Sequence, residues 1–110
     1  MKLTISAVQL HQMVKAVFPR VPPKKALVTV TLVDGSLILQ TKDAGTVLGV
    51  ISTANGEVIV SAKAFCGVVG TFQGTDFIEI EGSSDGLKFN AFKMPVLAWN
   101  PAPTMPKEFS

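Results

Sequence analysis

The chain holds one cysteine, one histidine and no tyrosine, and its apolar runs are short. One cysteine excludes an internal disulfide framework, and with one histidine it leaves too few ligands for a structural zinc site. The longest apolar stretches, such as Met94 to Trp99, fall far short of the ~20 residues that a membrane-spanning helix needs. Polar residues between Thr4 and Gln12 also interrupt the apolar segment that a secretory signal would require. We therefore expect a cytoplasmic protein that contacts no membrane.

The composition is that of a folded domain. Hydrophobic residues make up 47% of the 110 residues and charged residues 16%, and the mean hydropathy is +0.41. These proportions exclude a disordered chain. The length fits one domain, spanning 1–110, that buries roughly 65% of the surface of its extended chain.

Charge is segregated along the chain, although the net charge is only +2. The first 33 residues carry five basic side chains and no acid, whereas the remaining residues hold five lysines and eight acids. The N-terminal basic residues are Lys2, Lys15, Arg20, Lys24 and Lys25. A positive face of this kind can attract phosphates, and a solvated surface with few nearby acids is an equally ordinary explanation.

The apolar periodicity predicts a short strand, a helix and a hairpin in the first half. Lys2 to Ile5 is strand-like, and Ser6 with Gln9 forms a capping-box pattern at a helix start. The helix carries one apolar stripe and ends at the prolines from Pro19 onward. The stripe consists of Leu10, Met13, Val14 and Val17.

Alternating residues then predict strands. The alternation begins at Leu27, and Asp34-Gly35 supplies the left-handed pair of a two-residue hairpin turn. Two further strands are expected over 46–53 and 57–60.

The second half repeats the first with a shift of 55 residues. Val58 to Ala62 lies over Leu3 to Ala7, and the apolar stripes of the two helices coincide. The second stripe consists of Phe65, Val68, Val69 and Phe72. Strands over 76–81, 87–93 and 96–99 complete a second β-α-β-β unit. We therefore predict an α+β fold with pseudo-repeat halves at about 1–55 and 56–104, a proline-rich tail over 100–110, and two helices packed on one face of one antiparallel sheet.

The order and spacing of these motifs resemble a known family. The residues that carry the likeness are Asp34-Gly35, the stretches 37–43 and 56–65, and the tail 105–110. Together they are similar to the N-terminal domain of bacterial DNA polymerase III beta sliding clamps, the processivity rings of replicative polymerases. The resemblance implies a DNA-clamp fold and a ring of six such domains, in which helices line a central hole around duplex DNA. A chain of one domain would need six copies joined at their edge strands.

The same resemblance implies a set of DNA-facing residues that attract phosphates without reading base sequence. They are Gln12 and Lys15 on the first helix, Arg20, Lys24 and Lys25 in the loop after it, and Lys63 at the start of the second helix. On the second helix Gly67 and Gly70 stand at the positions equivalent to Gln12 and Lys15, so no charge is offered there.

The remaining candidate residues favour binding of a partner protein over catalysis. Gly67 and Gly70 leave space on the second helix for a close neighbour, and Trp99 either folds over the core edge or anchors a partner. His11 is expected to be an ordinary exposed histidine and Cys66 a packed or idle thiol. Glu79 and Glu81 alternate along a strand as a solvated outer face requires.

Three classes of function remain open. The favoured one is a non-enzymatic, clamp-like module for DNA replication that self-associates through edge strands and binds duplex DNA nonspecifically. The alternative is a clamp-fold regulatory module that binds a partner protein, such as a replication protein, and not DNA. An enzyme comes last, because the sequence has no glycine-rich phosphate loop or triad, and no cofactor is expected.

Overall fold

In a computed structural model, which describes residues 1–74 and 76–107, the chain forms two helices and ten strands. Neither helix in this part of the chain is long and apolar enough to cross a membrane. In chain order the elements are β1 (Lys2–Ser6), α1 (Ala7–Val17), β2 (Leu27–Val33), β3 (Ser36–Gln40), β4 (Gly45–Gly49), β5 (Ile51–Ala54), β6 (Gly56–Ser61), α2 (Ala62–Val69), β7 (Phe77–Ser83), β8 (Gly86–Phe89), β9 (Phe92–Met94) and β10 (Ala98–Asn100).

The strands form two antiparallel sheets that share one topology. Sheet A has the order β5-β1-β7-β8-β9, and sheet B has the order β10-β6-β2-β3-β4. The two orders match strand by strand when the elements of the halves are paired in chain order: β1 corresponds to β6, and β2, β3, β4 and β5 correspond to β7, β8, β9 and β10. The 55-residue shift relates β1 to β6 and α1 to α2. Each sheet takes strands from both halves of the sequence, so neither half could form its sheet alone.

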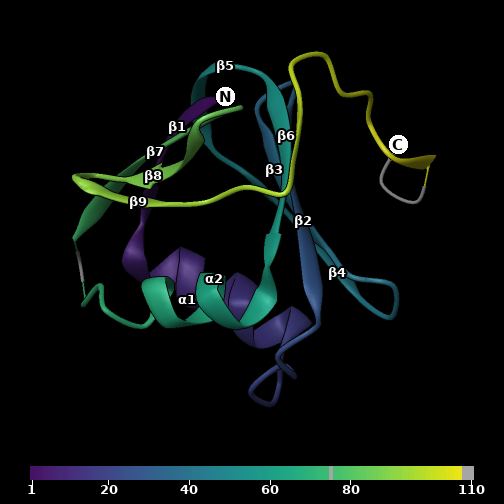
Figure 1. Cartoon of the computed structure of the whole chain (residues 1–110). Helices are drawn as coiled ribbons and strands as arrows, with labels where there is room; N and C mark the ends of the chain where they lie inside the picture. The colour runs from purple at the N-terminus through teal and green to yellow at the C-terminus, as the bar shows by residue number, and fades with distance from the viewer. Residues whose placement is uncertain (75, 108–110) are drawn as a thin grey trace.

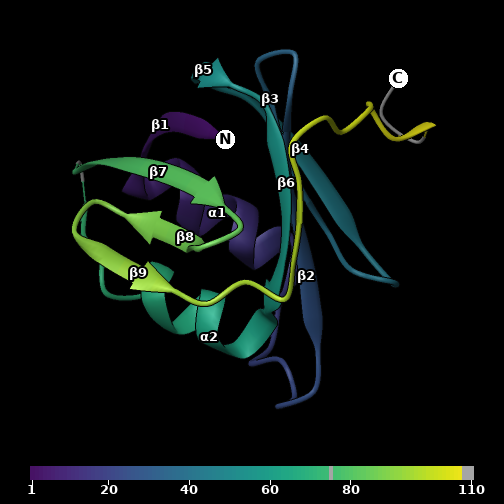
Figure 2. The same ribbon diagram turned by 45° about the horizontal axis from the view of Figure 1, so that its top comes forward.

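Both helices lie side by side on the same side of the two sheets, in the angle between them (Figures 1 and 2). This arrangement confirms the predicted α+β clamp-like fold with a shared helix layer. The sheet differs from the prediction in one respect, since it is divided into two sheets of 5 strands instead of one continuous sheet.

A short connection between β5 and β6 explains why the strands form two sheets. Only Asn55 separates β5 in sheet A from β6 in sheet B, so the chain changes direction before a hydrogen-bonded ladder can continue. At this corner the two sheets approach closely. A Cβ atom on Gly56 would lie 2.6 Å from the Trp99 ring, and one on Gly82 would lie 2.8 Å from the sulfur of Met1. Large side chains thus fill the seam where strands of one sheet would have to pair.

Two predicted strands are each broken into two. The segment predicted as 46–53 is divided after Val50, whose N–H donates to the Gly35 carbonyl at 2.9 Å next to the pairing of β4 with β3, whereas Ile51 pairs with Thr4 of β1 in the other sheet. The segment predicted as 87–93 is divided into β8 and β9 by a turn at Asn90, which adopts φ 55°. The Asn90 side chain fixes this turn because its Oδ1 accepts the Glu79 N–H at 2.9 Å. The predicted turn at Asp34-Gly35 is confirmed, with φ angles of 51° and 76°.

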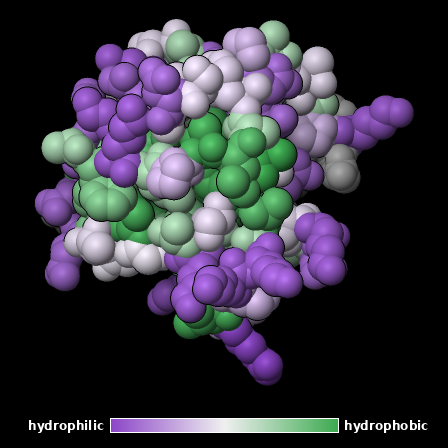
Figure 3. Space-filling model, in the orientation of Figure 1, coloured by the Kyte–Doolittle hydropathy of each residue, from purple (hydrophilic) through white to green (hydrophobic). Residues whose placement is uncertain are grey.

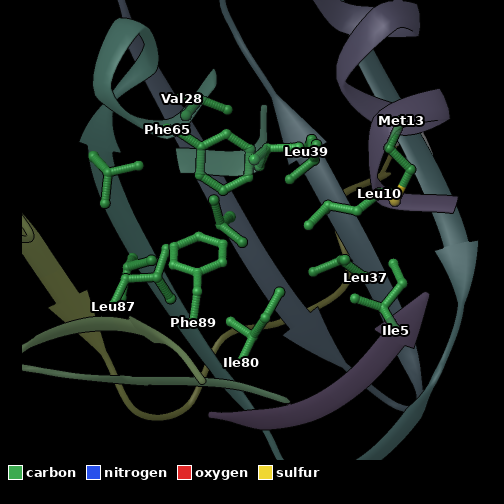
Figure 4. Close-up of a cluster of buried hydrophobic side chains, with 14 of the residues drawn as sticks. Ile5, Leu10, Met13, Val28, Leu37, Leu39, Phe65, Ile80, Leu87 and Phe89 are labelled. Atoms are coloured by element: carbon green, nitrogen blue, oxygen red, sulfur yellow. The ribbon is translucent and has the colours of Figure 1, made fainter. Parts of the chain in front are cut away.

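One core fills the space between the sheets and the helices. Figure 4 shows Phe65 from α2 beside Phe89 from β8, with Leu10 and Met13 of α1 reaching toward Leu39. The Phe65 and Phe89 rings lie 5.8 Å apart at 57°, a tilted contact that aromatic pairs favour. This packing orients both helices, because their apolar stripes have to face the same core.

The tail after β10 passes along the side of sheet B away from the helices (Figure 2). Pro103 is buried there. The last part of the predicted tail, residues 108–110, lies outside the described residues.

Candidate nucleic-acid interface

Helix α1 presents Gln12 and Lys15 to solvent because its cap and its buried stripe fix its rotation. The Ser6 hydroxyl accepts the Gln9 N–H at 3.2 Å and donates to the Gln9 side-chain oxygen at 3.1 Å. This is a variant of the predicted capping box, in which the glutamine contacts the hydroxyl. The helix buries Ala7, Leu10, Met13 and Val17 and leaves Gln12 and Lys15 exposed on the opposite face.

Helix α2 carries a single cation, Lys63, in its first turn. The Ser61 hydroxyl caps this helix by accepting the Ala64 N–H at 3.3 Å. A lysine in the first turn opposes the helix dipole, so the position of Lys63 does not serve local stability. Gly67 and Gly70 are exposed on the same helix, and a Cβ on Gly67 would meet nothing within 4 Å. The fold therefore has room for a side chain at position 67.

A hydrogen bond ties the first helix to the segment after the second. The His11 Nε2 lies 2.9 Å from the Phe72 carbonyl oxygen. Phe72 stands beyond the end of α2, where its ring packs 6.3 Å from Phe89. The prediction of an exposed histidine is therefore wrong: His11 is half-buried because the segment after α2 packs beside it, and its hydrogen bond supports the helix layer.

The loop between α1 and β2 adds Arg20, Lys24 and Lys25 to this layer. Its base is fixed because the Ala26 carbonyl accepts the Ala62 N–H at 2.9 Å at the start of α2. All three cations are exposed. The loop projects below the helices in Figure 1, and hydrophilic side chains dominate the same end in Figure 3.

The helices and this loop contain no carboxylate. No acid occurs in 7–26 or in 62–74, whereas these segments carry the five cations Lys15, Arg20, Lys24, Lys25 and Lys63. An ion pair joins Lys2 to Glu81, 3.6 Å apart on the outer face of sheet A, and it involves none of the five. The helix layer is therefore a positive surface with no neutralising acid in its own segments.

The structure does not bring the three predicted partner-binding residues together. Trp99 pairs with Val58 near the start of β6, whereas Gly67 and Gly70 lie on α2, which follows the end of that strand. The Trp99 ring is half-buried and packs over Gly56 against the core, as expected for a residue that folds over the core edge.

The lone thiol is a poor nucleophile. Burial raises the pKa of Cys66 above its ordinary value, which keeps the group protonated near neutral pH.

Two exposed apolar residues on edge strands, Val47 and Phe92, were not among the binding residues predicted from the sequence. Strands β4 and β9 each form one edge of sheets B and A, whose other edges are β10 and β5. Val47 on β4 is 44% exposed and Phe92 on β9 is 54% exposed. Hydrophobic side chains cover much of the face that β9 and the following segment cross (Figures 1 and 3). The alternation of apolar residues could have marked Phe92 only if the turn at Asn90 had been found first, because the turn reverses its strand.

The fold matches one domain of bacterial beta clamps. A Helicobacter pylori beta clamp in complex with carprofen superposes with a TM-score of 0.77 at 18% identity, over 96% of this chain and 32% of that chain. A Bartonella birtlesii sliding clamp bound to griselimycin gives 0.72 at 16% identity, over 96% of this chain and 32% of that chain. The DNA polymerase III subunit beta of Pseudomonas aeruginosa gives 0.65 at 23% identity, over 97% and 33%.

The present chain therefore spans about a third of the length of these clamps. No family model and no curated protein sequence matches it.

Proposed function

We propose that this protein is a non-enzymatic, cytoplasmic clamp module that binds duplex DNA nonspecifically through its helix layer. The observation that carries the proposal is that α1, α2 and the loop between α1 and β2 hold five exposed cations and no acid in their own segments. Flexible cations on a continuous surface attract the phosphates of both strands and release counterions, and they permit sliding because no base edge is read.

The ring that encircles DNA would be built from copies of this domain. The free edges of β4 and β9 offer unpaired backbone groups, and the exposed Val47 and Phe92 give each edge an apolar contact. An edge of sheet A against an edge of sheet B is a head-to-tail contact, which closes into a ring when the rotation between copies fits. Six copies would reproduce a six-domain ring.

A matched pair of charge variants tests DNA binding. In Lys24→Gln/Lys25→Gln two loop cations are neutralised, whereas Lys2→Gln/Lys88→Gln removes the same charge from strands β1 and β8, where both lysines are cross-strand neighbours of Glu81. We expect the loop variant to weaken binding to a long duplex and to reduce the slope of log K against log salt by about 2. The control variant should bind as the wild type does.

DNA binding is disproved if the wild type does not bind duplex at low salt. The assignment to the helix layer is disproved if both variants weaken binding equally.

The mass in solution tests self-association. The chain weighs 11.6 kDa, so a ring of six is distinguished from a monomer by sedimentation. Phe92→Ser should lower the mass, whereas Leu27→Ser, an exposed residue of the inner strand β2, should not. A strict monomer that fails to bind DNA would instead favour the alternative, a clamp-fold module that binds a partner protein through α2, where Gly67 leaves open space.

A further inference from the structure

A hollow of about 410 Å³ lies at a corner between the two sheets, beside the first turn of α1, and none of the five helix-layer cations lines it. It exists because β5 begins at Ile51, opposite Thr4, whereas β1 continues to Ser6. Before Ile51 the chain turns toward sheet B, where the Val50 N–H donates to Gly35. The end of β1 is therefore left without a neighbour on that side, and the space between β1 and the β4–β5 junction stays open.

Two large apolar side chains line this hollow and remain in contact with water. Ile51 is 74% exposed and Phe77 is 71% exposed. They belong to different strands, since Ile51 pairs with Thr4 on one side of β1 and Phe77 pairs with Ser6 on the other. The remaining lining comes from Thr4, Ile5, Ser6, Gln9, Gly35, Gly49 and Val50. A concave surface with apolar side chains and a few polar groups is typical of a binding site.

The charges around the hollow are mainly negative. Asp34 precedes the lining residue Gly35, and Asp76 precedes Phe77. Glu79 is the cross-strand partner of Thr4. Among the described residues the lining itself carries no charged side chain, so these neighbouring acids set the charge around the hollow, and the cation nearest along β1, Lys2, is paired with Glu81. These surroundings repel phosphates and attract cationic groups.

We propose that this corner hollow binds an extended segment of a partner protein, in which an aliphatic or aromatic anchor is flanked by lysine or arginine. The anchor enters between Ile51 and Phe77, and the flanking cations face the acids around the hollow. Complementary charge favours this occupant over an acidic peptide or a nucleic acid. The proposal does not depend on DNA binding, because none of the five helix-layer cations takes part.

A peptide titration of the full chain, followed by amide NMR shifts, tests the proposal. The probe is a blocked peptide Gly-Arg-Leu-Lys-Phe-Arg-Gly, and the control probe is Gly-Glu-Leu-Glu-Phe-Glu-Gly. We expect the basic peptide to shift the amides of Gly49, Val50, Ile51 and Phe77 and to bind about tenfold or more tightly than the acidic one. Ile51→Ser and Phe77→Ser should each weaken binding, whereas Val21→Ser, an exposed residue elsewhere, should not.

Three results would overturn the assignment. They are equal binding of the acidic peptide, shifts that map away from the hollow, and unchanged binding by both serine variants when urea unfolding shows them to be folded. A fourth result identifies a different occupant: if the hollow amides shift on dilution of the chain alone and Phe77→Ser lowers the mass, a second copy covers the hollow.

Discussion

Replacing Gly56 by alanine is expected to destabilise the protein, because the seam between the sheets has no room for a methyl group. A Cβ atom at this position would lie 2.6 Å from one Trp99 ring carbon and 2.7 Å from Met1 Cβ. The ring can tilt, but Met1 Cβ is bonded to the backbone and moves only if the start of β1 moves. Overpacking of this kind costs about 1–3 kcal/mol, which exceeds the ~0.4–1 kcal/mol that alanine gains by restricting the unfolded chain.

Gly67→Ala is the matched control, since it makes the same chemical change where a Cβ meets nothing within 4 Å. The glycine stands inside α2, so alanine should raise the free energy of unfolding by up to ~1 kcal/mol through helix propensity. Urea unfolding followed by far-ultraviolet circular dichroism measures both changes. For a domain of this size each kcal/mol also shifts Tm by about 4–8 °C.

A double variant separates the contact with the ring from the contact with Met1. Trp99→Leu should destabilise the Gly56→Ala background less than it destabilises the wild type, because removal of the ring also removes the clash. The reasoning is refuted if Gly56→Ala is as stable as the wild type. It is also refuted if the loss caused by Trp99→Leu is the same in both backgrounds, in which case the ring does not limit the space.

Two further predictions concern single side chains of the helix layer. His11→Ala removes the hydrogen bond to the Phe72 carbonyl, so we expect a loss of about 0.5–1.5 kcal/mol and faster amide exchange over 70–74; unchanged exchange there would contradict the structural role of this bond. Burial raises the pKa of Cys66, so the folded protein keeps this proton at a pH where the unfolded chain has released it. Stability should therefore fall as the pH rises above about 8.5, the ordinary thiol pKa, and a Cys66→Ala variant should lose that part of the decline.

The sequence was sufficient to predict which segments form helices and how the two halves correspond. Both serine caps and both apolar stripes depend on local chemistry, and Ser6 and Ser61 occupy the same position in the two halves. The hairpin at Asp34-Gly35 is local as well, because its left-handed backbone restricts the residues that fit.

The division into two sheets could not be predicted, because it depends on contacts between distant residues. The stretch 46–53 was predicted as one strand, but Gly49 pairs with Ser36 of sheet B and Ile51 pairs with Thr4 of sheet A, and both partners are distant in the sequence. The close contact at Gly82 was missed for the same reason, since a Cβ there would lie 2.8 Å from the sulfur of Met1, a residue far away in the sequence. The corner hollow follows from this division and was therefore missed too.

Among the helix-layer cations, Lys63 is the one whose removal is expected to change stability and DNA binding in opposite directions. It occupies the first turn of α2, where the free N–H groups make the helix end positive, and no acid stands in that turn to offset it. A cation at this position costs about 0.3–1 kcal/mol. Lys63→Gln should therefore raise the free energy of unfolding while it weakens DNA binding and reduces the salt slope by about 1. Lys15 lies in the last turn of α1, where a cation is favourable, so Lys15→Gln should weaken both stability and binding. If the two variants change stability in the same direction, the dipole does not govern these sites; if Lys63→Gln binds DNA unchanged, α2 is not part of the DNA-facing surface.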